Sequence, residues 1–305
     1  MPKRLDRDAL THYAEAGYIC PVRVFSEAQA ATYLRAFEAY EQAAAGPLEA
    51  AYKHKLHLVA GWAWELVHDP GILDAVEDLL GPDLLCWTTN LLAKNGGDRQ
   101  YVSWHQDAPY WRLEPHEVVT AWIALTPNTP EMGCMRVLPG SHKPPAAPHR
   151  DLFDADNMLT RGQRLVEDFA EDDGVPMPLG AGEISLHHVR LSHSSPPNRS
   201  SERRVGIAIR YMSADVQKRG RPESATLVRG EDRNGHFALE TRPDTDFSRT
   251  ARMAHNRAVR LQVANNYDAV GDEAAEVRET LANQRAALEK GLDFFYEQWR
   301  SEAAG

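Results

Sequence analysis

The chain has 305 residues, with 34 Lys+Arg against 44 Asp+Glu and a formal net charge of −10. This length is enough for one large domain, and the negative charge disfavours nucleic acid as a partner. No apolar run approaches the roughly 20 residues of a membrane span, so no membrane partner is expected. Its cysteines, Cys20, Cys86 and Cys134, are widely spaced and its N-terminus is charged, which disfavours a thiolate metal site and a secretory signal and indicates a cytoplasmic protein.

Helical patterns dominate the first part of the chain. Residues 7–17 are amphipathic and end at a glycine. Ser26 and Gln29 form the pattern of a capping box, which predicts a helix over about 26–45. An Asp-Pro pair then predicts the start of a short helix over 71–80, which a Gly-Pro pair ends.

From residue 84 the pattern changes to short runs rich in β-branched, aromatic and aliphatic residues. These runs are LLCWTTNLLA, VVTAWIALT, CMRVLPG, GEISLHH and RVGIAIRYM, and Gly, Pro, Asn and Ser separate them. Because no helical pattern lies between them, they predict a sandwich or barrel and not a parallel sheet with crossover helices. The fold class expected is therefore α+β with a mainly β core.

The remaining segments complete a single expected domain, 1–305. Its parts are a helical region over 1–83, a β core over 84–214 and a mixed tail over 215–305. Within the core, residues 145–180 are polar and predict a long loop or lid. In the tail, apolar residues at helical spacing predict a helix over residues 271–300; they are Val277, Leu281, Leu288, Leu292, Phe295 and Trp299.

Two short segments carry candidate chemistry. In Trp104-His105-Gln106-Asp107, the imidazole and the carboxylate are two residues apart and would share one face of a strand. By itself this triplet is a weak signal, because it occurs by chance in many chains. In the second segment, His193 ends an apolar run before a Pro/Asn/Ser turn, and Arg204 opens the next run.

Taken together, these residues could form a metal site with a carboxylate-binding group beside it. Two histidines and one carboxylate leave three positions open on Fe(II). The guanidinium of Arg204 can hold a carboxylate through two hydrogen bonds. Considered alone, Arg204 is better explained as a solvated charge beside Glu202 and Arg203.

Four ordered motifs resemble the phytanoyl-CoA dioxygenase-like family of Fe(II)/2-oxoglutarate oxygenases. They are HQD, VVTAWIALTP, GCMRVLPGSH and HSSPPNRSSERR, and the resemblance runs from about Tyr18 to Ala214. It implies a double-stranded β-helix, also called a jelly roll and cupin-like, flanked by helices. It also implies dependence on Fe(II), 2-oxoglutarate and O2.

The resemblance further implies the role of each matching residue. His105, Asp107 and His193 would bind iron and form the catalytic centre. Four more residues would contact 2-oxoglutarate, with the first two holding its distal carboxylate: Arg204, Ser195, Trp122 and Asn90.

The reaction expected is hydroxylation of a small molecule coupled to oxidative decarboxylation of 2-oxoglutarate. A halogenase is disfavoured because such enzymes usually replace the carboxylate ligand, and Asp107 is present. A desaturase, or an inactive binding module of the same fold, remains open. Tyr110 and Trp111 either line a substrate pocket or pack the core, and Arg190 and Arg210 either meet an anionic substrate or lie on the surface. Neither the substrate nor the oligomeric state follows from the sequence.

Overall fold

The computed structural model describes residues 2–43, 46–48, 50–152, 154–159, 161–267, 279, 282–283 and 285–286. Its helices are α1 (Arg7–Ala16), α2 (Glu27–Ala43), α3 (Gly61–Val67), α4 (Pro70–Leu80), α5 (Ala108–Trp111) and α6 (Arg249–Tyr267), with two short 3₁₀ helices, Ala50–Lys53 and Leu56–Leu58. The helix expected over 271–300 falls almost entirely outside the described residues, and its six named apolar residues all do.

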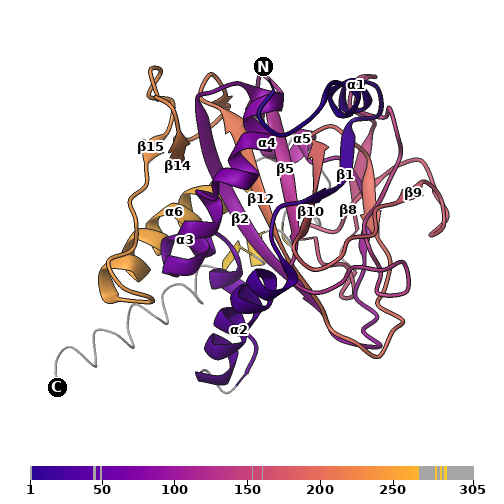
Figure 1. Cartoon of the computed structure of the whole chain (residues 1–305), viewed down its shortest axis with the longest axis horizontal. Helices are drawn as coiled ribbons and strands as arrows, with labels where there is room; N and C mark the ends of the chain where they lie inside the picture. The colour runs from indigo at the N-terminus through magenta and orange to yellow at the C-terminus, as the bar shows by residue number, and fades with distance from the viewer. Residues whose placement is uncertain are drawn as a thin grey trace.

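A seven-stranded sheet forms the larger wall of the molecule (Figure 1). In spatial order its strands are β1 (Tyr18–Arg23), β10 (Glu183–His188), β5 (Val118–Ala124), β12 (Arg204–Ser213), β2 (Leu84–Lys94), β14 (Ser224–Arg229) and β15 (Ala238–Leu239). All neighbours are antiparallel except β14 and β15. The sheet thus includes one strand from the region expected to be helical and two from the region expected to be a tail.

A smaller four-stranded sheet lies opposite the inner face of the large one. It contains β3 (Val102–His105), β11 (His193–Ser195), β6 (Arg136–Val137) and β9 (Val175–Pro176), in that order and all antiparallel. Two strand pairs complete the fold: β4 (Leu113–Glu114) with β13 (Gln217–Lys218), and β7 (His149–Asp151) with β8 (Gln163–Leu165). Two facing antiparallel sheets with flanking helices confirm the predicted fold class.

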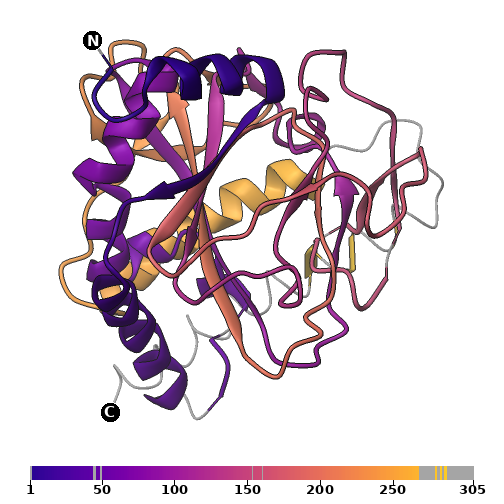
Figure 2. The same cartoon turned by 45° about the vertical axis from the view of Figure 1, so that its right-hand side comes forward.

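Alternation along the strands separates the two faces of the large sheet. On β5, Val119, Ala121 and Ile123 belong to the apolar core shared with the N-terminal helices, whereas Thr120 and Trp122 face the interior cavity. Since successive strand residues point to opposite faces, the same pattern continues on β12 and β2. Helices α2, α3 and α4 cover the outer face, and the inner face is left to line a cavity (Figures 1 and 2).

The first turns of α2 and α4 are capped as the sequence predicts. Ser26 and Gln29 form the expected capping box, with the Ser26 backbone N–H donating to the Gln29 side chain at 2.9 Å and the Gln29 N–H donating back to Ser26 Oγ at 3.2 Å. Asp69 accepts from the first N–H groups of α4, and Pro70 occupies the first turn. None of the described helices is long and apolar enough to cross a membrane.

The segment 145–180 contains more regular structure than its polar composition predicts. It contains β7, β8 and β9, although most of it is irregular. Met158, Leu159 and Arg161 from this segment reach the interior cavity. The segment therefore supplies part of the cavity wall.

Candidate active site

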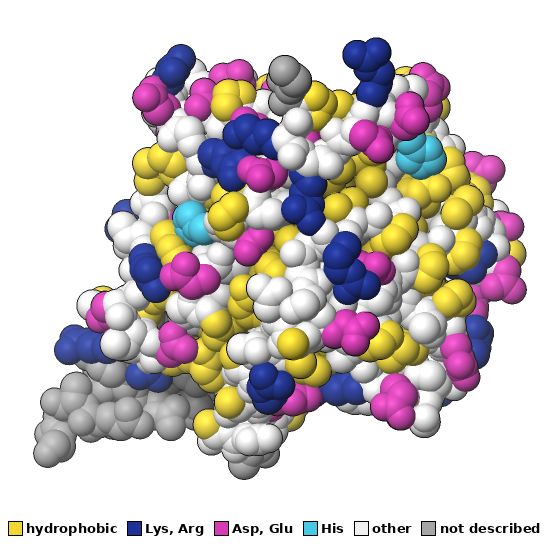
Figure 3. Space-filling model, in the orientation of Figure 1, with side chains coloured by type: hydrophobic (Ala, Val, Ile, Leu, Met, Phe, Trp, Pro, Cys, Tyr) yellow, Lys and Arg dark blue, Asp and Glu magenta, His cyan; other side chains and the backbone are white. Residues whose placement is uncertain are grey.

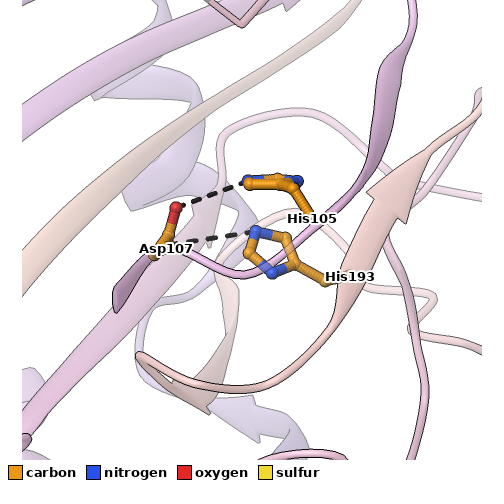
Figure 4. Close-up of side chains that lie close together, drawn as sticks. All are labelled: His105, Asp107 and His193. Carbon is orange, nitrogen blue, oxygen red and sulfur yellow. Dashed lines mark ion pairs between the residues drawn. The ribbon is translucent and has the colours of Figure 1, made fainter. Parts of the chain in front are cut away.

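Three predicted metal ligands converge at one end of the small sheet. His105 ends β3, His193 begins β11, and the two residues are direct partners in the antiparallel register. Asp107 follows His105 by two residues. All three side chains are buried, and their ligand atoms lie within 4.8 Å of one another (Figure 4).

The local backbone around Asp107 differs from the expected strand. The strand ends at His105, and Asp107 has helical angles of φ −76° and ψ −38° at the start of α5. Its carboxylate nevertheless turns toward both imidazoles, at 3.4 Å from His105 Nε2 and 4.0 Å from His193 Nε2. The predicted convergence is present, but a strand-to-helix turn produces it, and not strand alternation.

Both imidazoles are held with the same nitrogen toward the carboxylate. His105 Nδ1 lies 2.9 Å from the carbonyl of Ser103, and His193 Nδ1 lies 2.9 Å from the carbonyl of Leu191. A carbonyl can only accept, so each Nδ1 carries a proton, and Nε2 is the ring nitrogen that faces Asp107 and can bind a metal ion. This orientation by a backbone carbonyl is typical of histidine metal ligands.

The charge states of the cluster also suit a divalent metal ion. Burial opposes ionisation of Asp107, but the adjacent His105, His193 and Arg210 outweigh burial and lower the pKa of Asp107 below its usual range. Burial, with a smaller contribution from His105, lowers the pKa of His193 to about 4. Two imidazoles and one carboxylate are the donor set that Fe(II) takes in facial sites, so the residues present fit that ion.

A second cluster lies farther along the same cavity, around the hydroxyl of Ser195. That hydroxyl accepts from Arg204 Nη1 at 3.0 Å and from Lys94 Nζ at 2.8 Å, and it donates to the carbonyl of Gly133 at 2.9 Å. Arg204 also donates to the Gly133 carbonyl. Arg204 is 3% exposed and Lys94 0%, and no carboxylate of a described residue forms an ion pair with either. A buried guanidinium and a buried amine around one hydroxyl form a site for an anion.

Trp122 forms the wall beside this cluster. Its ring lies 5.4 Å from the Arg204 guanidinium, and its indole N–H donates to Asn128 Oδ1 at 3.1 Å. A Cβ atom at position 206 would collide with this ring, so Gly206 provides the space in which Trp122 lies. The ring and the Arg204 head group are thereby held in fixed positions relative to each other.

One cavity of about 410 Å³ joins the two clusters. All seven predicted site residues line it: His105, Asp107, His193, Arg204, Ser195, Trp122 and Asn90. Asn90 is hydrogen-bonded to Arg210 and His54 and lies away from the Ser195 cluster. Tyr110, Trp111 and Arg210 also line the cavity, whereas Arg190 bonds the backbone carbonyls of Lys143 and Pro144.

Comparison with protein families decides the classification. Residues 13–206 match the sequence profile of the phytanoyl-CoA dioxygenase (PhyH) family, which is well over half of the chain. The chain belongs to the phytanoyl-CoA dioxygenase family. Iron and 2-oxoglutarate dependence, with O2 as the usual co-substrate, is therefore confirmed for this chain at the level of its family, and the His–Asp–His cluster fits the metal.

The alignments between this chain and its curated relatives cover only part of each relative. The chain is 32% identical, over 50% of its length, to a protein of Stutzerimonas stutzeri named as a probable alpha-ketoglutarate-dependent hypophosphite dioxygenase, and the match covers 53% of that protein. It is 30% identical over 48% of its length to the peroxisomal phytanoyl-CoA dioxygenase of Homo sapiens, of which 44% is covered. The match thus spans about half of each curated relative.

Solved structures extend the similarity over most of the fold. The apo structure of the non-heme monooxygenase ThoJ has a TM-score of 0.77 and 36% identity, and the match covers 86% of this chain and 98% of ThoJ. CytC3 with Fe(II) and alpha-ketoglutarate has a TM-score of 0.60 at 22% identity, over 79% of this chain and 95% of CytC3, and supports the fold alone.

Three polar residues were not singled out as site residues from the sequence: His187 and Gln262 line the cavity, and Lys94 lies behind its wall, bonded to Ser195. Lys94 lies four residues after Asn90 on β2, so the alternation along this strand contained a signal for it. His187 lies with its ring 4.9 Å from that of His193, but the His187-His188 pair does not reveal which member faces inward. Gln262 comes from α6, far along the chain, and no motif marks it.

Proposed function

We propose that this family member is a single-domain Fe(II)/2-oxoglutarate-dependent oxygenase that hydroxylates a small molecule. The observation that carries the proposal is the shared cavity, where a His–Asp–His cluster and a buried cationic cluster both open. An inactive module would not need both clusters complete.

The chain's own residues have distinct roles in this proposal. His105, Asp107 and His193 hold Fe(II) through two Nε2 atoms and one carboxylate. Arg204, Ser195 and Lys94 bind the distal carboxylate of 2-oxoglutarate, and Trp122 keeps water from one side of the co-substrate. Bound Fe(II) with 2-oxoglutarate supplies O2 activation and oxidation of a substrate C–H bond, with release of succinate and CO2.

Hydroxylation is favoured over halogenation because of Asp107. A carboxylate ligand, two histidines and bidentate 2-oxoglutarate leave one position, which O2 requires. A halide would need that carboxylate to leave, and the carboxylate's charge also repels a second anion.

The decisive experiment is a screen for substrate-dependent succinate release in the presence of Fe(II) and 2-oxoglutarate, followed by mass spectrometry of the product. We expect a product heavier by one oxygen atom, even with excess chloride or bromide present. A halogenated main product would contradict the hydroxylase assignment. A product lighter by two hydrogen atoms would favour a desaturase.

A cytoplasmic location is part of the proposal. Cys20, Cys86 and Cys134 are all free thiols in the structure, which fits a reducing compartment. Localisation of a tagged chain in cell fractions tests it.

A further inference from the structure

Arg210 lies on the cavity face of β12, apart from the 2-oxoglutarate cluster. It is six residues from Arg204, and at about 3.3 Å per residue the two Cα atoms are about 20 Å apart along the strand. Its strand partners are Thr120 on β5 and Thr88 on β2. All four residues line the cavity, so the two arginines serve different parts of it.

The Arg210 guanidinium has no counter-charge within ion-pair distance among the described residues. It donates to Asn90 Oδ1 and, at 3.5 Å, to the Ala208 carbonyl, while its Nε lacks a partner. Its other neighbour is the face of Trp111, 5.2 Å away. Asp107 is near enough to attract the Arg210 charge but forms no ion pair with it. A half-buried arginine without an ion-pair partner is costly unless an anion binds there.

Counting the charges of the loaded site leads to the same conclusion. Fe(II) brings two positive charges and Arg204 brings one. Asp107 and the two carboxylates of 2-oxoglutarate bring three negative charges. Arg210 then remains uncompensated, and Lys94 adds positive charge whenever it is protonated. By contrast, acidic and basic side chains are intermixed on the molecular face in Figure 3.

The surroundings of Arg210 add hydrogen-bond donors and an apolar wall. Thr120 Oγ1 and Gln262 Nε2 are buried without hydrogen-bond partners among the described residues, and Gln262 is connected to Thr88 through a 3.4 Å hydrogen bond. Trp111 stands 5.2 Å from Trp87, and both rings line the cavity. Donors beside aromatic rings suit a ligand with an anionic end and an apolar body.

We propose that Arg210 binds the primary substrate through a carboxylate, with Trp111 and Trp87 holding the substrate's apolar body. The inference rests on the proposed function and names its substrate class, a small organic acid with an aromatic or branched body. Arg210 is a specificity-determining residue. Asn90, which is itself hydrogen-bonded to His54, accepts a hydrogen bond from the Arg210 guanidinium and keeps it in place.

The test uses the anaerobic Fe(II)–2-oxoglutarate form of the full chain. The probes are a panel of small monocarboxylates, led by phenylacetate, each paired with its primary amide, such as phenylacetamide. Binding is followed by the change in the visible absorption of the iron–2-oxoglutarate complex. At least one acid should bind about tenfold or more tightly than its amide, the ratio expected for a charge-assisted hydrogen bond.

Arg210→Gln should remove this preference, and Arg210→Lys should restore part of it because the charge is kept. Arg233→Gln, which changes an exposed arginine paired with Glu231, is the matched control and should preserve the preference. Circular dichroism verifies that each variant is folded. The affinity for 2-oxoglutarate is measured in parallel for Arg210→Gln and Arg204→Gln.

Three results would overturn the inference. One is a panel in which no acid binds more tightly than its amide, including a panel in which nothing binds. Another is an Arg210→Gln variant that loses as much 2-oxoglutarate affinity as Arg204→Gln, because Arg210 would then belong to the co-substrate site. The third is failure of the unaltered protein to form the iron–2-oxoglutarate complex, which alone would also overturn the proposed function.

Discussion

The two ends of the cavity are built in different ways. The end around Ser195 is made of neighbours within the sheets: Arg204 and Lys94 are partners in the β12–β2 register, and Ser195 follows the proposed metal ligand His193 by two residues. The end around Arg210 also needs side chains from α5, from α6 and from the segment 145–180. Strand register determines the first end, whereas packing of distant segments determines the second.

A buried polar network shows how the second end is stabilised. Trp87 donates its indole N–H to Glu223 at 2.6 Å, and Glu223 also accepts from Lys218 at 3.1 Å and from Asn265 of α6 at 2.7 Å. Lys218 in turn donates to the Trp111 carbonyl at 2.6 Å. One buried ion pair therefore ties both cavity tryptophans to the C-terminal helix. The comparison teaches that the end around Arg210 depends on residues far from the cavity, whereas the end around Ser195 depends mainly on strand register.

The largest effect is expected where both ends meet, at the metal. His105→Ala or His193→Ala should weaken Fe(II) binding by at least about a hundredfold, since each removes one of three ligands. Anaerobic titration with Fe(II) measures the affinity. The exposed His236 provides the control, because His236→Ala should leave iron affinity unchanged. Unchanged stoichiometry and affinity in both ligand variants would refute the assignment.

The second prediction concerns the network behind the tryptophans. Glu223→Gln leaves Lys218 buried without its counter-charge, so the free energy of unfolding should fall by about 3–5 kcal/mol. Urea denaturation measures it. Glu231→Gln, which breaks an exposed pair with Arg233, should cost no more than about 0.5 kcal/mol. Equal losses of unfolding free energy in the two variants would contradict the prediction that the buried Glu223–Lys218 pair stabilises the fold more than an exposed pair does.

The third prediction separates the two faces of the strand that carries Arg204. Arg204→Gln should raise the dissociation constant for 2-oxoglutarate at least about tenfold, since a charge-assisted hydrogen bond is lost. Arg203→Gln should change it little, because Arg203 lies on the outer face and pairs with Glu41 of α2 at 2.7 Å. Calorimetric titration of the iron-loaded protein compares them, and similar effects would contradict the site.

The smallest predicted effect is a pH dependence from Lys94. Burial, with the nearby Arg204, lowers the pKa of Lys94 to about 6, so the amine is mostly neutral at pH 7 before 2-oxoglutarate binds. A bound carboxylate favours the charged amine and raises its pKa, so binding takes up a proton. Affinity should therefore weaken as the pH rises above about 6, by a few-fold per pH unit.

Lys94→Gln provides the comparison for this pH dependence. The variant should bind 2-oxoglutarate more weakly near pH 6, and its affinity should vary less with pH than that of the unaltered protein. Dissociation constants measured over about pH 6–8 for both proteins decide the matter. Parallel pH profiles in the two proteins would show that another group carries the dependence.

Local sequence patterns predicted the fold class, whereas most of the first end was predicted through the resemblance to the family. Alternation in VVTAWIALT separates core positions from cavity positions, and the capping box at Ser26 marks a helix start. The placement of β1 in the large sheet was missed, since six residues between two helices give a weak strand signal.

What the sequence alone determined is the set of residue types that carry the chemistry. One cavity of the structure is lined by all four of the residues concerned, which come from two separate segments of the sequence: His105, Asp107, His193 and Arg204. Only the tertiary structure decided which polar residues join them. Lys94, Arg210 and Gln262 are separated by more than fifty residues from one another, so no local pattern relates them. Register and helix packing bring Arg210 and Gln262 to the wall of one cavity and the Lys94 amine to the hydroxyl of Ser195, because burial of the outer sheet face fixes which side chains point inward.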